Sequence, residues 1–201
     1  GLVGSEMCIR DRSNIKEAAK WICSPPVRDK SDSEALWRGI EEKVLDLVSS
    51  DHAPYSFDEK GKFFMGNNPN FKEIPNGMPG LHWRLPIILN NVLRKQCNLD
   101  LHDFIRITST MPAKIYGLYP KKGEIRIGSD ADITIWNKDK KVTLTDEMVV
   151  DGSKYNPYSG FEVFCWPDEV LLRGHTIVKN NKIMGKQNIG KFLPTKLSDY
   201  I

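Results

Sequence analysis

The hydrophobic pattern of the chain changes near Gly117, and this change limits the possible folds more than any other feature of the sequence. Before Gly117, apolar residues at helical spacing alternate with short apolar runs and polar loops, which is typical of an α/β protein. After it, short apolar stretches are separated by turn residues, which predicts mostly β structure. The 201 residues suffice for one large domain or two small ones. We therefore expect an α/β segment followed by a smaller β segment.

Five helices are predicted before Gly117 from apolar spacing and from start and stop signals. Ser31 and Glu34 have the pattern of a capping box, Asp100 is suited to cap the fourth helix, and Pro112 to open the fifth. The predicted ranges are residues 14–21, 33–42, 81–95, a helix that follows Asp100, and one from about 112 to 117.

A short apolar run from Val44 to Val48 predicts a buried strand, and the polar residues Ser49-Ser50-Asp51-His52 follow it directly. In barrels of alternating strands and helices, active-site residues lie at the C-terminal ends of strands. A carboxylate at Asp51 could bind a cation or accept a proton from metal-bound water. Aspartate is also common as a cap in such turns, so both interpretations stay open. The other histidines have no His-x-His or HExxH spacing; they are His82, His102 and His175.

Two proline-containing turns could display main-chain groups at fixed positions. They are Ser24-Pro25-Pro26 and Ile74-Pro75-Asn76-Gly77, the second within a long loop from Tyr55 to Gly80. Their N–H and C=O groups could hold a planar amide or imide, although ordinary surface turns have the same composition. The aromatic residues of the long loop argue against disorder. A loop of this length in a compact domain is then usually functional.

Strands are predicted in the second half of the chain. Residues 123–136 alternate around Gly128-Ser129-Asp130, which predicts a β-hairpin. Further strand-like segments are residues 141–144, 162–164, 169–172 and 176–183, the last with a turn at Asn180-Asn181. The sequence therefore divides into residues 13–118, residues 119–185 and a polar tail, residues 186–201.

Composition excludes several classes of protein. There are 29 basic and 26 acidic side chains, a net charge of +3, and no basic cluster interleaved with aromatic residues, so nucleic-acid binding is not expected. No apolar run approaches the roughly 20 residues that span a bilayer, and no secretory signal is recognisable. The widely spaced cysteines predict reduced thiols and a cytoplasmic protein; they are Cys8, Cys23, Cys97 and Cys165.

Residues 1–12, GLVGSEMCIRDR, have neither periodicity nor a helix cap. The string resembles translated adapter sequence from the end of an assembled sequencing read, and a disordered natural N-terminus is the alternative. We therefore leave residues 1–12 out of the fold interpretation.

Six sequence blocks occur in a fixed order along the chain. They are Trp21-Ile-Cys-Ser-Pro-Pro-Val-Arg28, Ser50-Asp-His-Ala-Pro-Tyr55, Phe71-Lys-Glu-Ile-Pro-Asn-Gly77, Thr110-Met-Pro-Ala-Lys-Ile-Tyr-Gly117, Lys122-Gly-Glu-Ile-Arg-Ile-Gly-Ser-Asp-Ala-Asp-Ile133 and Tyr155-Asn-Pro-Tyr-Ser-Gly160. Each block is short, but the ordered series from about Asn14 to Phe192 resembles the hydantoinase/dihydropyrimidinase family of cyclic amidohydrolases. The resemblance is to the C-terminal part of these enzymes.

The resemblance implies part of a TIM (β/α)₈ barrel with a binuclear zinc centre, next to a small β-sandwich built from both chain ends. Asp51 matches the aspartate that binds one metal and shuttles the proton of the bridging hydroxide. Ser24 and Asn76 match residues whose main-chain groups hold the cyclic amide. His52 matches the family's Ser-Asp-His pattern in a supporting role. The family's His-x-His, carboxylated lysine, remaining histidines and substrate-contacting tyrosine have no counterpart in this chain.

The implied activity is zinc-dependent hydrolysis of the ring amide of dihydropyrimidines or hydantoins by a cytoplasmic homotetramer. Its partner is a small-molecule cyclic amide, with neither nucleic acid nor a membrane involved. An allantoinase-like enzyme is one alternative, and a non-catalytic interaction protein like the collapsin response mediators is another. The loop at Ile74–Gly77 favours the hydantoinase side, and Asp51 favours an enzyme. Since a complete barrel needs roughly 250 residues, we expect this chain alone to be poorly stable and inactive.

Overall fold

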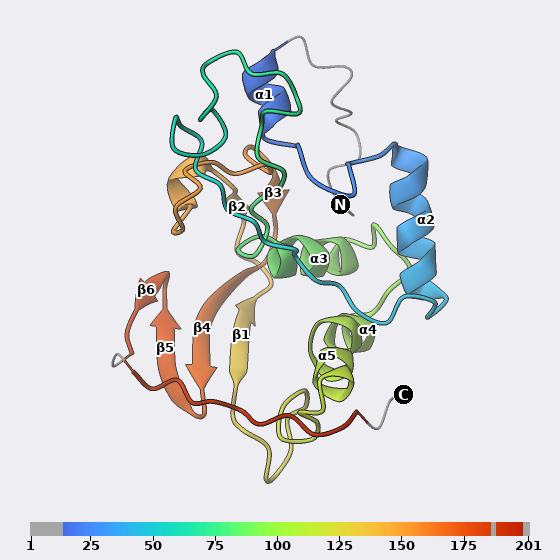
Figure 1. The fold of residues 1–201 in the computed structure, drawn as a ribbon. Helices are drawn as coiled ribbons and strands as arrows, with labels where there is room; N and C mark the ends of the chain where they lie inside the picture. The colour runs from blue at the N-terminus through green and yellow to red at the C-terminus, as the bar shows by residue number, and fades with distance from the viewer. Residues whose placement is uncertain (1–13, 186–187, 199–201) are drawn as a thin grey trace. The chain divides into compact units, whose positions relative to one another are not determined.

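The computed structural model describes residues 14–185 and 188–198 (Figure 1). Residues 1–12 and the ends of the predicted tail, 186–187 and 199–201, lie outside the described residues. Residue contacts divide the chain into two units. The first comprises residues up to Leu45, Ser49–Ile87 and Thr143–Val163, and the second comprises Asp46–Val48, Ile88–Val142 and the chain from Phe164 onward.

Two helices, α1 (Ile15–Ala19) and α2 (Lys30–Glu41), lie in the first unit. Asn14 caps α1, because its side chain accepts a hydrogen bond from the N–H of Lys16 at 2.9 Å. Helix α2 begins earlier than predicted, directly after Asp29, which makes no side-chain capping bond. The predicted capping box of Ser31 and Glu34 was therefore wrong, since both residues lie inside the helix.

The predicted strand from Val44 to Val48 is not formed. Val44 is 71% exposed and Leu45 is 36% exposed. A buried parallel strand needs hydrogen-bonded neighbours, and the described residues contain no strand paired with this segment. The prediction failed because an apolar run becomes a strand only beside a partner strand.

The long loop from Tyr55 to Gly80 belongs to the first unit and packs against other parts of it. A hydrophobic cluster is formed by Ala19, Ile22, Phe63 and Ile74. The ring of Phe57 packs on this cluster and lies 4.9 Å from the ring of Tyr155, measured between centroids. The prediction that the loop is ordered is therefore confirmed, although Phe64 and Phe71 are exposed.

Helix α3 (Arg84–Leu93) falls at the division between the units, and α4 (Leu101–Ile105) and α5 (Met111–Ile115) lie in the second unit. The predicted cap of α4 is confirmed, because Asp100 and Asp103 form a reciprocal capping box. None of the helices in the described part of the chain is long and apolar enough to cross a membrane.

A π-helical turn, η2 (Arg106–Thr110), joins α4 to α5. The predicted helix start at Pro112 therefore lies inside a continuous helical segment. Proline lacks an N–H and crowds the carbonyl four residues before it, and a widened turn accommodates this. Gly117 ends the segment with φ of 64°, as predicted.

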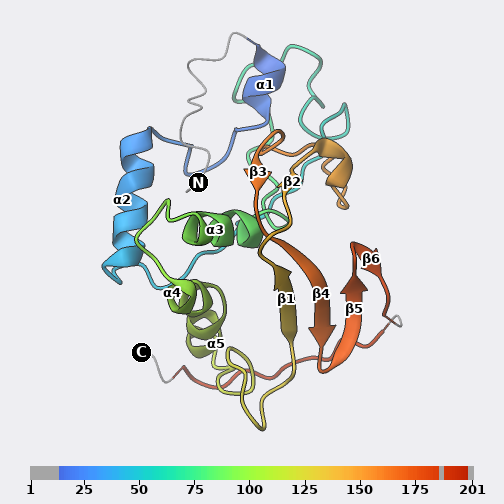
Figure 2. The same ribbon diagram turned by 180° about the vertical axis from the view of Figure 1, so that it is seen from behind.

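Four antiparallel strands of the second unit form a sheet in the order β1-β4-β5-β6 (Figure 2). Their bounds are β1 Ile133–Asn137, β4 Trp166–Leu172, β5 His175–Lys179 and β6 Lys182–Ile183. Phe104 of α4 contacts Trp136 of β1 edge to face, with ring centroids 6.3 Å apart. A separate pair is formed by β2 (Val142–Thr143) and β3 (Glu162–Val163), with the 3₁₀ turn η3 (Asp146–Met148) between them in sequence.

The hairpin predicted for residues 123–136 was wrong. Ile125 is 82% exposed, Ile127 is fully exposed, and β1 pairs with β4 instead. Lys122 forms ion pairs with Asp130, at 2.9 Å, and with Asp132. These contacts fold the segment into an irregular turn, and the alternating pattern therefore did not indicate two paired strands.

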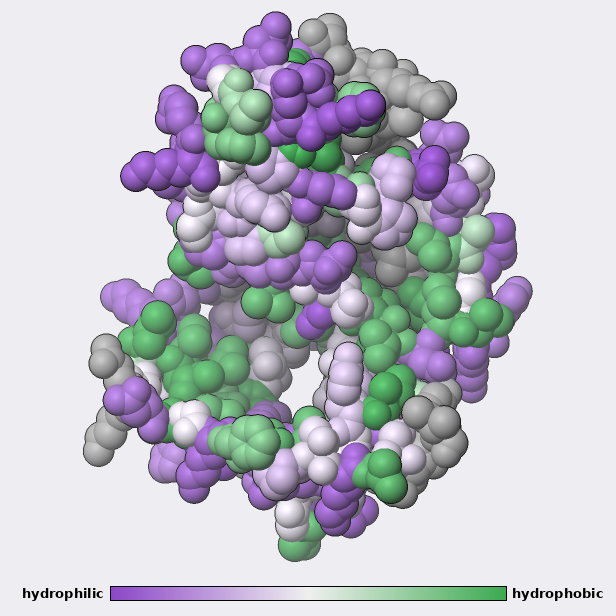
Figure 3. All heavy atoms as spheres, in the orientation of Figure 1, coloured by the Kyte–Doolittle hydropathy of each residue, from purple (hydrophilic) through white to green (hydrophobic). Residues whose placement is uncertain are grey.

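One row across the sheet is mostly apolar and only partly covered. The strand registers place Thr134, Val170, Val178 and Ile183 side by side, and Ile183 is 88% exposed. Figure 3 shows apolar side chains gathered over β5 and β6. The described residues thus form a mixed α/β structure with no closed barrel, and the predicted β-sandwich is not confirmed. A barrel closes only when every strand has two neighbours, which these strands do not provide.

Candidate functional site

Three residues singled out in the sequence line one cavity of about 300 Å³ in the first unit. Ser24 lies in the turn after α1, Asp51 in the segment after α2, and Asn76 near the end of the long loop. The side-chain amide of Asn76 donates a hydrogen bond to the Ser24 hydroxyl at 2.6 Å. Tyr158 also lines the cavity. The fold thus brings together residues that are far apart in sequence.

Asp51 has an unusual backbone conformation, with φ of 42°. The left-handed region is costly for residues with a Cβ atom, so the surrounding chain must hold it. The next residue, His52, forms a parallel bridge with Met78, and the Ala53 N–H donates to the Met78 carbonyl at 3.0 Å. These bonds fix the chain immediately after Asp51, which is exposed and lines the cavity.

The ring of His52 joins three segments of the first unit. Its Nδ1 accepts hydrogen bonds from the N–H of Gly80 at 3.1 Å and of Leu81 at 3.3 Å. Its Nε2 lies 3.4 Å from Oδ2 of Asp151. Because Nδ1 accepts, the ring proton is assigned to Nε2, where it faces the carboxylate. His52 thus holds the chain beside Asp51.

Asp151 lies between two imidazole rings. His82 Nδ1 is 3.5 Å from the same carboxylate oxygen that faces His52. Burial raises the pKa of Asp151, but hydrogen bonds from Ser153 and the two nearby histidines outweigh burial, and the pKa falls below its ordinary value. The carboxylate is therefore ionised at neutral pH and suited to orient His52.

The residues around the cavity match a metal centre only in part. Asp51 offers one carboxylate, whereas zinc takes three or four protein ligands. Within residues 14–185 and 188–198, no three His, Cys, Asp or Glu side chains are arranged to hold a metal ion. Asp51 fits one ligand position, and the described residues alone do not form a metal centre.

Three residues near the cavity were not predicted as functional: Lys62, Asp151 and Tyr158. Lys62 is fully buried and donates to main-chain carbonyls on both sides of Asn76. A single lysine in a polar loop and an aspartate 99 positions beyond His52 have no local pattern that indicates such contacts. Tyr158 belongs to one of the six sequence blocks, but that block assigned it no role.

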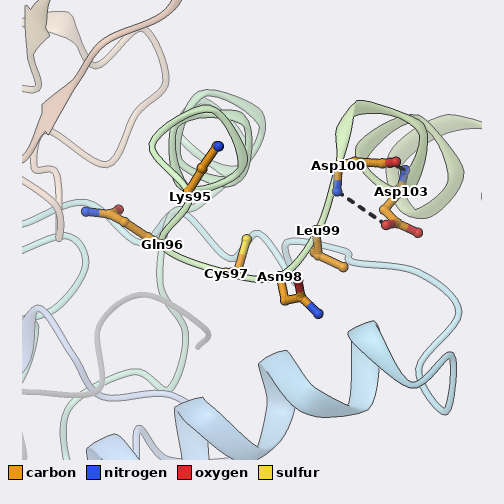
Figure 4. A pocket seen from close by; sticks show the side chains of 7 residues that line it. All are labelled: Lys95, Gln96, Cys97, Asn98, Leu99, Asp100 and Asp103. Carbon is orange, nitrogen blue, oxygen red and sulfur yellow. Dashed lines mark hydrogen bonds between the residues drawn. The ribbon is translucent and has the colours of Figure 1, made fainter.

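A larger hollow of about 720 Å³ lies along the connection between α3 and α4 (Figure 4). The acidic residues on its wall, Asp100 and Asp103, face each other across the start of α4. Asp103 N–H donates to Asp100 Oδ1 at 2.9 Å, and Asp100 N–H donates to Asp103 Oδ2 at 3.3 Å. Both carboxylates serve as helix caps, so the cavity with Asp51 is the candidate site.

Comparison with known proteins gives consistent matches. The model of the amidohydrolase family matches residues 7–177. A D-hydantoinase of Ralstonia pickettii is 37% identical over 177 residues, which cover 88% of this chain and 38% of that protein. A D-hydantoinase crystal structure has a TM-score of 0.86 at 33% identity and covers 96% of this chain and 40% of its own. The structure of a dihydropyrimidinase from Brevibacillus agri NCHU1002 has a TM-score of 0.84 at 35% identity. This match covers 92% of the present chain and 39% of the dihydropyrimidinase chain.

The chain therefore spans about 38% of the length of the curated relative it matches. The family model extends over almost all of the residues that form the cavity and the sheet. The chain belongs to the amidohydrolase family.

Proposed function

We propose that this chain is the C-terminal part of a zinc-dependent cyclic amidohydrolase that opens the ring amide of dihydropyrimidines or hydantoins. The observation that carries the proposal is the meeting of Ser24, Asp51 and Asn76 around one cavity. The similarity to proteins named D-hydantoinase and dihydropyrimidinase supports the substrate class.

Asp51 has the central chemical role in this proposal. Together with ligands from outside this chain it would hold one zinc ion of a binuclear centre, which lowers the pKa of water and polarises the ring carbonyl. The Asp51 carboxylate accepts the proton of the attacking water and returns it to the ring nitrogen as the C–N bond breaks. Its exposure to the cavity leaves the carboxylate free to exchange a proton.

Ser24 and Asn76 orient the substrate. A ring amide presents one N–H and one C=O in a plane, and main-chain groups in rigid turns can match both. The bond between the Asn76 amide and the Ser24 hydroxyl keeps the two turns together. Such prior positioning lowers the entropic cost of reaching the reactive geometry.

His52 supports Asp51 from behind the cavity. Replacing His52 with alanine in the complete enzyme is expected to lower kcat/KM about 10- to 100-fold, as loss of a supporting residue commonly does at metal sites. His52→Asn keeps an acceptor near the Gly80 N–H and should recover part of the loss. His175→Ala, at an exposed position of β5, is the control. Equal kinetics for His52→Ala and His175→Ala would contradict the role of His52.

In the complete enzyme, we propose that residues 13–118 belong to the barrel domain and residues 119–185 to a composite β-sandwich, with residues 186–201 as a tail. Strands from outside this chain would cover the apolar row that ends at Ile183. We also propose a cytoplasmic homotetramer.

The 201-residue chain alone is expected to aggregate and to hydrolyse no cyclic amide, because apolar surface is uncovered and the described residues hold no complete set of metal ligands. Light scattering and a dihydrouracil assay with added zinc test this. A monodisperse, active chain would show that no further segment is needed.

The substrate assignment is tested with the complete protein on dihydrouracil, hydantoin and allantoin. We expect kcat/KM to be higher for dihydrouracil and hydantoin than for allantoin. Preference for allantoin would identify an allantoinase-like enzyme. No hydrolysis of any of the three by a folded, zinc-loaded protein would favour a non-catalytic interaction protein.

A further inference from the structure

Lys62 is a fully buried lysine whose ammonium group bonds to main-chain carbonyls. Its Nζ donates to the carbonyl oxygens of Pro75 at 2.7 Å, Gly77 at 2.6 Å and Ile22 at 3.3 Å. Within the described residues it forms no ion pair with a carboxylate, and its Nζ lies 5.8 Å from the centre of the Tyr55 ring. An ammonium group has three N–H donors, so the three carbonyls use all of them.

The three carbonyls belong to the two turns that line the cavity. Pro75 and Gly77 flank Asn76, and Ile22 lies two residues before Ser24. The N–H of Gly77 also donates to the Ile22 carbonyl at 2.9 Å. Lys62 therefore bonds to both turns from beneath while Asn76 and Ser24 meet at the cavity surface.

Burying a charged group without a counter-ion costs free energy, so the presence of a buried lysine at this position requires a reason. Burial lowers the pKa of Lys62 to about 8, yet the side chain is still mostly protonated at neutral pH. An uncharged side chain of the same length would leave the Pro75 and Gly77 carbonyls without their Lys62 donor, whereas Ile22 would keep its bond from Gly77. The loss would thus fall on the two residues that flank Asn76.

We propose that Lys62 is a positioning residue that fixes the main chain on both sides of Asn76 against the turn of Ser24, and so sets the fit of the ring amide. This inference rests on the proposed function. Lys62 touches no reacting atom, because it lies under the turns and does not line the cavity. Its expected effect is on substrate binding, because its three hydrogen bonds go to the turns of Ser24 and Asn76.

The test compares Lys62→Met with wild type in the complete zinc-loaded protein, using dihydrouracil. Lys62→Met should raise KM about 30-fold, since buried carbonyls lose their donors, with a much smaller change in kcat and with unchanged zinc content. A purely structural lysine would reduce the active fraction and lower apparent kcat at constant KM. Lys60→Met, at an exposed position in the same loop, is the matched control.

A second variant keeps the inference testable if Lys62→Met folds poorly. In Lys62→Ala, n-propylammonium can occupy the space of the missing side chain, and it should lower the raised KM in a concentration-dependent way. Propan-1-ol, which has the same length but no charge, should not. An unchanged KM in Lys62→Met, or a raised KM in Lys62→Ala that the amine does not lower, overturns the inference while an active wild type preserves the proposed function. An inactive wild type overturns both.

Discussion

Replacing Asp51 with asparagine in the complete enzyme is expected to lower kcat for dihydrouracil about 100- to 10,000-fold, the range for loss of a general acid–base group. Asparagine keeps the size of the side chain but can neither accept the proton of the attacking water nor return it. The protein should stay folded, because Asp51 is exposed at the cavity and the substitution keeps the size of its side chain.

The control for this prediction is Asp139→Asn, which removes an exposed carboxylate paired with the neighbouring Lys138. Its kcat should equal that of wild type. Turnover by Asp51→Asn within a few fold of the Asp139→Asn value would contradict the proton-transfer role of Asp51.

Gly77→Ala is expected to damage both the stability and the activity of the enzyme. Gly77 has φ of 154°, and a Cβ atom there would lie 2.5 Å from the Ala53 Cβ and 3.1 Å from a ring carbon of Tyr55. Overpacking and backbone strain together should cost about 3 kcal/mol of stability. Because the Gly77 carbonyl accepts from Lys62 and its neighbour Asn76 lines the cavity, kcat/KM should also fall about 100-fold. Thermal denaturation and dihydrouracil kinetics measure the two effects.

Gly66→Ala is the matched control for this change. Gly66 lies in the same loop with φ of 113°, but among the described residues beyond its two chain neighbours no atom would lie within 4 Å of a Cβ atom there. It should lose stability only through backbone strain and keep wild-type kcat/KM. If Gly66→Ala and Gly77→Ala had equal effects, the close packing at Ala53 would not be important.

Local signals in the sequence predicted those features of the fold that local chemistry determines. Asp100 caps α4, and Gly117 ends α5, because a side-chain oxygen and a missing Cβ act over a few residues. The strand at Val44–Val48 and the hairpin at residues 123–136 were wrong. A strand depends on a partner elsewhere in the chain, and neither an apolar run nor an alternating pattern provides one.

The candidate site likewise contains some residues that the sequence predicted and others that it did not. Asp51, Ser24 and Asn76 were singled out from turn chemistry and from family resemblance, and the fold places them around one cavity. Lys62 could not be predicted, because its partners are main-chain carbonyls, which every residue carries, and Ile22 is 40 positions away. The contact between His52 and Asp151 is equally non-local.

The most direct test of the central claim is the metal dependence of ring opening in the complete protein. Wild type and Asp51→Asn would be stripped with a chelator, reloaded with zinc, and assayed for bound zinc and for dihydrouracil hydrolysis. If the central claim is right, stripping abolishes hydrolysis, zinc restores it in wild type, and Asp51→Asn binds less zinc and stays inactive. Hydrolysis that survives complete removal of metal, or equal zinc binding and activity in both proteins, would contradict it.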